Sequence, residues 1–165
     1  MKTLYLNRHA KSSWENNGLS DFERPLNQRG KRDAPLMGNV LSGLVKKPDV
    51  IYSSPALRAI TTAKIIADSF GYKRNNIIKD ERIYDSTISS ILKIINSIAD
   101  KYETIMIFGH NTTFTMLSNY LSDKPIMNLP TSGFVQIDFN LESWSEIEGN
   151  TGRLILFEYP KKHLK

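Results

Sequence analysis

Short apolar runs alternate with segments of helical periodicity along most of this chain, and this alternation is the strongest constraint on its fold. Each run begins with apolar residues and closes on polar ones, which is typical of strands buried within a sheet. The runs lie at residues 4–8, 49–53 and 104–109, with a weaker one at 77–78. Strands that alternate with helices form right-handed crossovers and a mostly parallel sheet with helices on both faces. The sequence therefore predicts a three-layer α/β/α fold.

Apolar side chains recur every three or four residues between these runs, which predicts helices. The helical segments are 37–44, 57–70, 88–99 and 114–121. Ser54 and Pro55 suit the N-cap and the first position of the second helix, and Gly71 suits a left-handed residue at its end. Pro35 removes a hydrogen bond from any helix that contains it, so we expect a kink or a restart near Asp33.

The last third of the chain has a different pattern. Residues 134–139 and 153–159 are strand-like, and no helical segment lies between them. Two such strands in succession predict an antiparallel edge on the otherwise parallel sheet. The length of 165 residues suits a single domain that spans residues 1–165.

Composition removes several classes of function. The chain has no cysteine, which excludes disulfide scaffolds, thiolate metal sites and cysteine nucleophiles. Its apolar runs are too short to cross a bilayer, and no signal-peptide core follows the first residues, so we expect a cytoplasmic protein without a membrane partner. The net charge is +5; residues 1–74 carry 13 basic and 6 acidic side chains, against 9 and 11 in residues 75–165. This asymmetry favours an anionic ligand, although a solvated basic face has the same composition.

Polar residues close the predicted strands, where ligands of open parallel sheets bind. Arg8 ends the first run and His9 follows it, and His110 follows the third run. Arg58 falls in the first turn of the helix after the second run. Guanidinium groups beside a helix N-terminus predict a site for a phosphoryl group. Packing roles for the histidines and a structural ion pair for Arg58 are the alternatives.

Histidine is the nucleophile that remains after elimination. The chain has no P-loop, dinucleotide fingerprint, D-x-D, G-x-S-x-G, H-E-x-x-H or H-x-H motif. A neutral imidazole, with an ordinary pKa of about 6.5, can attack phosphorus in line. Arg8, Arg58 and His110 would then stabilise the phosphoryl oxygens. We expect neither a metal nor another cofactor.

Several segments resemble the histidine phosphatase (phosphoglycerate mutase-like) superfamily, and they occur in the family's order. Residues 6–10 resemble the Arg-His-Gly/Ala signature of the superfamily, and residues 8–14 with 24–30 are similar to its short SixA-type phosphohistidine phosphatase branch. Residues 53–63 resemble the second sequence block of the family, and residues 109–111 resemble the third. The resemblance implies a phosphoglycerate mutase-like fold with His9 as the nucleophile. It implies a phosphate pocket made by Arg8, Arg58 and His110.

Arg24 is a further candidate for the phosphate pocket. It lies in the stretch 10–26, which is long for a connection without periodicity and therefore suits a loop that borders a site. An ion pair of Arg24 with Asp21 or Glu23 is the alternative. Lys11 and Trp14, in the same stretch, either contact a protein substrate or pack the loop.

Glu81 is the first candidate for the general acid that protonates the leaving group. Residues 80–84 resemble the superfamily segment that supplies this acid to members that cleave phosphomonoesters. Asp85 is the second candidate, and a solvated cluster of charges is the alternative. An imidazole leaves more readily than an alkoxide, so a phosphohistidine substrate needs less help from an acid.

These observations predict a metal-independent phosphatase that removes phosphate from phosphohistidine on a protein, through a phospho-His9 intermediate. The first alternative is the same chemistry on a small phosphorylated metabolite, and the second is a phosphate-binding module without turnover. A nucleic-acid partner is not expected, because the basic half of the chain has no basic-aromatic motif. We favour a monomer.

Overall fold

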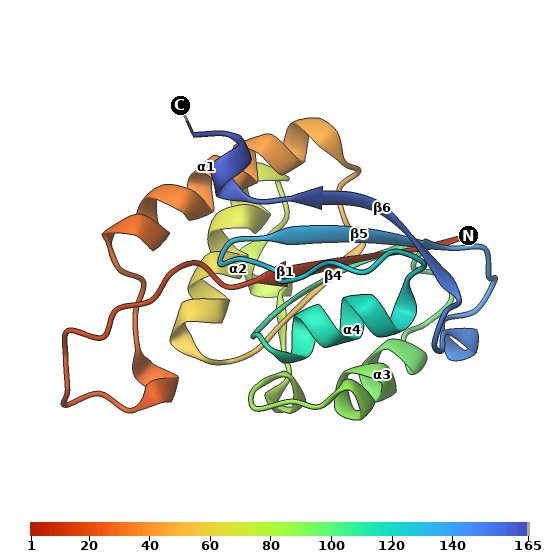
Figure 1. The fold of residues 1–165 in the computed structure, drawn as a ribbon, viewed down its shortest axis with the longest axis horizontal. Coiled ribbons are helices and arrows are strands. Elements are labelled where there is room, and N and C mark those ends of the chain that lie inside the picture. Colours follow the sequence, from red (N-terminus) through yellow and green to blue (C-terminus); the bar gives the residue numbers. More distant parts are fainter. Residues whose placement is uncertain (165) are drawn as a thin grey trace.

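The core of the structure is a six-stranded sheet with the order β3-β2-β4-β1-β5-β6 (Figure 1). The computed structural model describes residues 1–164. The strands are β1 (Lys2–Arg8), β2 (Val50–Ser53), β3 (Ile78–Lys79), β4 (Thr104–Gly109), β5 (Phe134–Phe139) and β6 (Gly152–Glu158). The first four are mutually parallel, whereas β5 runs antiparallel to both β1 and β6. The predicted parallel sheet with an antiparallel C-terminal edge is confirmed.

Helices cover both faces of this sheet, as predicted (Figure 1). One face packs against α1 (Gln28–Leu44) and α2 (Leu57–Ser69), and the other against α3 (Ile88–Asn96) and α4 (Thr113–Leu121). In β4, Ile105 and Ile107 join the core under α3 and α4, whereas Met106 and Phe108 join the core under α1 and α2. This alternation follows from the pleat, which directs successive side chains to opposite faces.

The helix α1 continues through Pro35 from Gln28 to Leu44, so the predicted restart near Asp33 is wrong. A proline inside a helix removes one backbone hydrogen bond, and the remaining bonds still connect the turns on either side. Met37 and Leu41, which follow the proline, are fully buried against the sheet. Burial of this apolar face offsets the missing bond.

The helix α2 begins at Leu57 with Ala56 as its N-cap residue, so the predicted cap at Ser54 is wrong. Ser54 instead lies between β2 and the helix, where its Oγ accepts from the backbone N–H of Ala56 (3.2 Å). The same Oγ lies 2.8 Å from Nε2 of His110. The serine thus links the ends of two parallel strands. Gly71, just after the helix, has the expected positive φ of 66°.

The parallel strands end at the same edge of the sheet. Arg8 is in register with Gly109, and Ser53 is in register with Phe108. The long connection 10–27 extends from this edge, where it is drawn in red and orange at the left of Figure 1. The residues that follow β1, β2 and β4 are therefore brought together beside this loop. None of the helices within residues 1–164 is both long and apolar enough to cross a membrane.

Candidate active site

A pocket of about 180 Å³, here called the phosphate pocket, lies beyond the ends of β1 and β4. It brings together Arg8, His9, Arg58 and His110, which were predicted from the ends of the strands, and Arg24 as well. Its lining residues are Arg8, His9, Lys11, Ser12, Trp14, Arg24, Arg58, His110, Asn111 and Thr131. Four of these side chains are cations, and none is a carboxylate. Such a lining favours a compact anion.

His9 is held in one tautomer by the backbone. Its Nδ1 lies 2.7 Å from the carbonyl oxygen of Ala10. A carbonyl oxygen only accepts hydrogen bonds, so Nδ1 carries the hydrogen and Nε2 keeps its lone pair. The ring is 7% exposed, and burial, with further contributions from His110, Arg58 and Arg8, lowers the pKa of His9 to about 3. His9 is therefore neutral at pH 7, with a free nitrogen suited to nucleophilic attack.

His110 stands beside His9, with 5.1 Å between the centroids of the two rings. Its Nε2 lies 2.8 Å from the hydroxyl oxygen of Ser54. Burial, together with the charges of Arg58 and Arg8, lowers the pKa of His110 to about 4. Without a bound anion, both histidines are neutral at pH 7, and the positive charge of the pocket comes from guanidinium and ammonium groups.

Backbone and hydroxyl contacts also position Arg8 and the residue after His9. Arg8 Nη1 donates to the carbonyl oxygen of Leu129 at 3.0 Å. The backbone N–H of Ala10 donates to Thr62 Oγ1 (2.9 Å), and the Thr62 hydroxyl donates to the carbonyl oxygen of Arg58 (2.7 Å). Thr62 therefore connects the residue after His9 to the first turn of α2.

Arg58 has an acidic partner that its own segment does not provide. Its Nη1 donates to the backbone carbonyl of Asp21 at 2.7 Å, and its Nη2 to Asp21 Oδ2 at 3.0 Å. Tyr84 OH donates to the same carboxylate oxygen at 2.7 Å. Burial raises the pKa of Asp21, but the hydrogen bonds from Tyr84, Arg24 and Arg58 outweigh it and lower that pKa to about 2. Asp21 is therefore ionised at neutral pH.

Arg24 forms the ion pair with Asp21 that was the alternative to a phosphate contact, with 2.9 Å between Nη1 and Oδ1. Its Nε donates to the carbonyl oxygen of Ser13 at 3.0 Å, and its Nη2 donates to Ser12 Oγ. The guanidinium also stacks on the ring of Trp14. These contacts anchor the loop, and the role of Arg24 in phosphate binding stays a prediction.

A second pocket of about 450 Å³ adjoins the phosphate pocket and is here called the side pocket. It shares three lining residues with the phosphate pocket: Arg58, His110 and Asn111. The others are Asp21, Tyr84, Asp85, Ser86, Thr112 and Thr113. Of the two predicted acids, Asp85 lines this pocket, whereas Glu81 is exposed in the short turn 81–83 and lines neither pocket. The role of Glu81 as general acid stays a prediction.

Sequence reasoning missed three residues that organise this site: Asp21 as the partner of Arg58, Tyr84 as a second donor to Asp21, and Ser54 as the partner of His110. Asp21 was considered only for Arg24, its neighbour in sequence. Its other partners lie 37 and 63 residues away, so local spacing has no signal for them. Ser54 had a signal, its position before a helix, but that signal indicated a cap.

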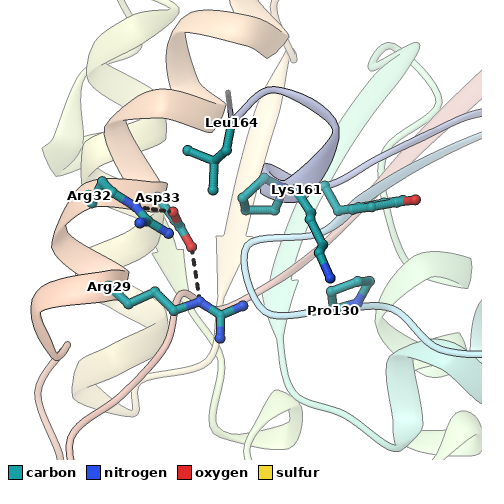
Figure 2. Close-up of a pocket in the computed structure, with 8 residues that line it drawn as sticks. Arg29, Arg32, Asp33, Pro130, Lys161 and Leu164 are labelled. Carbon is teal, nitrogen blue, oxygen red and sulfur yellow. Dashed lines mark hydrogen bonds and ion pairs between the residues drawn. The ribbon is translucent and has the colours of Figure 1, made fainter.

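A pocket of about 360 Å³ lies elsewhere, between α1 and the C-terminal segment (Figure 2). There, buried Asp33 forms ion pairs with Arg32 (2.9 Å) and Arg29 (3.5 Å). None of the residues selected from the sequence lines this pocket. In the same C-terminal segment, His163 Nε2 lies 2.6 Å from a carboxylate oxygen of Glu158. Within residues 1–164, no group of three or more histidine or acidic side chains is arranged to hold a metal ion.

Solved structures with the same fold include SixA proteins. The SixA protein of Agrobacterium tumefaciens matches with a TM-score of 0.79 and 27% identity, over 96% of this chain and 98% of that one. The protein histidine phosphatase SixA in complex with tungstate matches with a TM-score of 0.82 and 18% identity, over 97% and 98% of the two chains. The phosphoglycerate mutase-like fold expected from the resemblance is thus confirmed.

Sequence comparison finds relatives of known and unknown activity. An uncharacterized protein of Mycobacterium tuberculosis is 27% identical, over 93% of this chain and 99% of that protein. Phosphoserine phosphatase 1 of Hydrogenobacter thermophilus is 39% identical, over 52% of this chain and 39% of that enzyme. The model of the histidine phosphatase superfamily (branch 1) matches residues 4–90, more than half of the chain. The chain therefore belongs to the histidine phosphatase superfamily, branch 1.

Proposed function

We propose that this protein is a metal-independent phosphatase that removes the phosphoryl group from phosphohistidine on a protein, through a phospho-His9 intermediate. The observation that carries the proposal is the state of His9. Its Nδ1 is committed to the Ala10 carbonyl and its pKa is about 3, so a neutral Nε2 is available in a pocket lined by cations.

In the first step, Nε2 of His9 attacks phosphorus, and the bond from phosphorus to the leaving nitrogen breaks. A phosphohistidine that is protonated on its other ring nitrogen leaves as neutral imidazole and needs no proton from the enzyme. Arg8 and Arg58 offer guanidinium donors to the phosphoryl oxygens, and His110 offers a neutral ring. Stabilisation of these oxygens is the main catalytic task in phosphoryl transfer.

In the second step, water attacks the phosphorus of phospho-His9. The bond to Nε2 breaks, inorganic phosphate leaves, and the proton of the attacking water goes to solvent or to the phosphate. Throughout both steps, Nδ1 keeps its hydrogen bond to the Ala10 carbonyl, which supports the positive charge on the phosphorylated ring. His9 returns to its starting tautomer.

The surroundings of the pocket support a macromolecular substrate. Trp14 lines the phosphate pocket and is 71% exposed, and Lys11 lines it as well. The side pocket adjoins the phosphate pocket at Arg58, His110 and Asn111, which leaves room for the part of a substrate that extends beyond its phosphoryl group. The likeness to SixA proteins, one of them named as a protein histidine phosphatase, supports the same substrate class.

A phosphomonoesterase that acts on a small metabolite is the second candidate. The observation that favours it is the 39% identity to phosphoserine phosphatase 1, which extends over about half of this chain. This chemistry places a greater demand on a general acid, because an alkoxide is a poorer leaving group than imidazole. Glu81 and Asp85 are the candidates for that acid.

The test is the release of phosphate from a phosphohistidine peptide and from p-nitrophenyl phosphate, measured in parallel with EDTA present. We expect the phosphohistidine peptide to have the higher kcat/KM. His9→Ala should lower turnover by about 10³-fold or more and abolish the acid-labile phosphoenzyme, because the attacking nitrogen is gone.

Each other outcome has a defined meaning. Preference for the monoester would move the substrate to a small metabolite while retaining His9 as the nucleophile. Undiminished activity of His9→Ala would refute the phospho-His9 intermediate, and binding of tungstate without any turnover would favour a phosphate-binding module. The cytoplasmic location also stays a prediction, which cell fractionation would test.

A further inference from the structure

The charges of the two adjoining pockets are segregated. The phosphate pocket is lined by Arg8, Lys11, Arg24 and Arg58 and by no carboxylate. The side pocket is lined by two carboxylates, Asp21 and Asp85, and its one cation is Arg58, which both pockets share. A molecule that spans both pockets thus meets positive charge at one end and negative charge at the other.

The two carboxylates of the side pocket differ in whether they already have hydrogen-bond partners. Asp21 is occupied by Arg24, Arg58 and Tyr84. The Asp85 side chain is exposed, and it makes no hydrogen bond or ion pair within residues 1–164. An unpaired carboxylate at the wall of a pocket attracts a cation and repels an anion.

Asp85 has a defined place in the pocket wall. Its backbone has a φ of 52°, in the left-handed region that aspartate adopts more readily than most residues. The next residue, Ser86, accepts a hydrogen bond at its carbonyl oxygen from the Thr113 hydroxyl at 2.8 Å, which ties the segment to α4. The Asp85 carboxylate is therefore attached to a backbone segment that is anchored to α4.

We propose that the side pocket receives the leaving group, and that Asp85 makes it selective for leaving groups that carry positive charge. The proposal rests on the proposed phosphatase function, because it assigns the part of the substrate that remains after phosphate transfer. In this arrangement the phosphoryl group lies among the cations of the phosphate pocket and contacts Arg58, which both pockets share. The rest of the substrate then lies in the side pocket and faces Asp85. Phosphorylated basic side chains and phosphorylated amines fit this arrangement, whereas phosphorylated hydroxy acids do not.

The test uses three aryl phosphates that differ in charge at one position: para-(aminomethyl)phenyl, para-methylphenyl and para-(carboxymethyl)phenyl phosphate. Their phosphoryl groups are the same and their phenols are of similar acidity, so differences in kcat/KM report mainly on the charged arm. Attraction of the ammonium and repulsion of the carboxylate are each worth up to about fivefold for an exposed pair. We expect the ammonium compound to be favoured over the carboxylate compound by about tenfold at low ionic strength, with a smaller preference at high salt.

Asp85→Asn keeps the size of the side chain and removes its charge. The variant should lower the ammonium-over-carboxylate ratio to within about twofold of unity. Because loss of a general acid would slow all three compounds alike, this ratio reports on charge selectivity alone. Glu142→Gln is the matched control. Glu142 is an exposed acid that follows the end of β5. This end of β5 pairs with the start of β1, at the edge of the sheet opposite the site. Removal of the Glu142 charge should therefore leave the ratio unchanged.

Binding of the three compounds, measured by calorimetry with inactive His9→Ala protein, separates this proposal from the phosphatase function. If the unmodified protein turned over neither these compounds nor the phosphohistidine peptide, and the Asp85-dependent binding ratio were retained, the phosphatase function would be refuted and the cation-selective pocket kept. A ratio near unity in the unmodified protein would refute the selectivity, and so would a ratio that Asp85→Asn leaves unchanged.

Discussion

Two groups of side chains line the phosphate pocket and the adjoining side pocket, and they are held in different ways. Arg8 ends β1, His9 follows β1 and His110 follows β4, and backbone carbonyls or the Ser54 hydroxyl hold these side chains. We call them the strand-end group. Arg24, Arg58 and Tyr84 come from a loop, a helix and a turn, and a single carboxylate, that of Asp21, holds them. We call them the Asp21 group.

The two groups differ in whether a bound ligand can compete for the contacts that hold them. The contacts of the strand-end group come from the sheet and its connections, which a ligand does not compete for. The contacts of the Asp21 group involve guanidinium donors that a phosphoryl group also uses, and Asp21 itself is half exposed, at 47% for the side chain. The strand-end group is therefore preorganised by the fold. The Asp21 group is held by the Asp21 carboxylate, which a bound phosphate either joins or replaces.

Among variants of the Asp21 group, the largest expected effect is that of removing Arg58, which lines the phosphate pocket beside His9. Arg58→Ala should lower kcat/KM by about a hundredfold, or about 3 kcal/mol of transition-state stabilisation, because phosphoryl oxygens lose a charged donor. Steady-state kinetics with the preferred substrate measures this. Arg153→Ala, in an exposed position on β6, is the control. A nearly unchanged rate would show that the strand-end group binds the phosphoryl group alone.

An intermediate effect is expected from Asp21→Ala, which removes the shared acceptor of Arg24, Arg58 and Tyr84. We expect kcat/KM to fall by about tenfold, because guanidinium groups that are no longer oriented bind the phosphoryl oxygens less well. Limited proteolysis within residues 10–27 should become faster at the same time. Glu15→Gln, an exposed acid of the same loop, should change neither quantity. A faster rate for Asp21→Ala would instead identify Asp21 as a competitor of phosphate.

The third prediction concerns stability rather than rate, and it tests the strand-end group. The folded pKa values of His9 and His110, about 3 and about 4, lie below the ordinary 6.5. The unfolded chain therefore binds more protons as the pH falls below 6.5, and the folded state loses stability there. Each histidine contributes up to about 1.4 kcal/mol per pH unit, so we expect a loss of about 2 kcal/mol per pH unit between pH 6.5 and 4.5, and a plateau above pH 7.

Urea unfolding across this pH range measures the slope, and His9→Asn should make it shallower. Asp21, whose pKa is lowered to about 2, contributes stability that is lost only below about pH 4, so it does not obscure the result. A free energy of unfolding that does not vary between pH 4.5 and 7 would mean that the histidines are not held neutral.

The strand-end group was predictable from the sequence because it follows from short-range patterns and one rule of topology. Residues 104–109 were predicted as a strand and form β4 with the same bounds, and residues 134–139 likewise form β5. The apolar runs predict which segments form buried strands. Because buried strands of this kind are parallel, their carboxyl ends meet at the same edge of the sheet. The start of α2 was not predictable in the same way, because Ser54 contacts a histidine 56 residues away instead of capping the helix.

By itself, the sequence determined the layers of the fold and the residues at the ends of the parallel strands, because apolar periodicity and strand order depend on local composition. Only the tertiary structure decided the Asp21 group and the charge of the side pocket. The carboxylates of Asp21 and Asp85 are separated by 64 positions in the chain, yet both line the side pocket. Electrostatic interactions depend on distance in space and not along the chain, so no local pattern marks them.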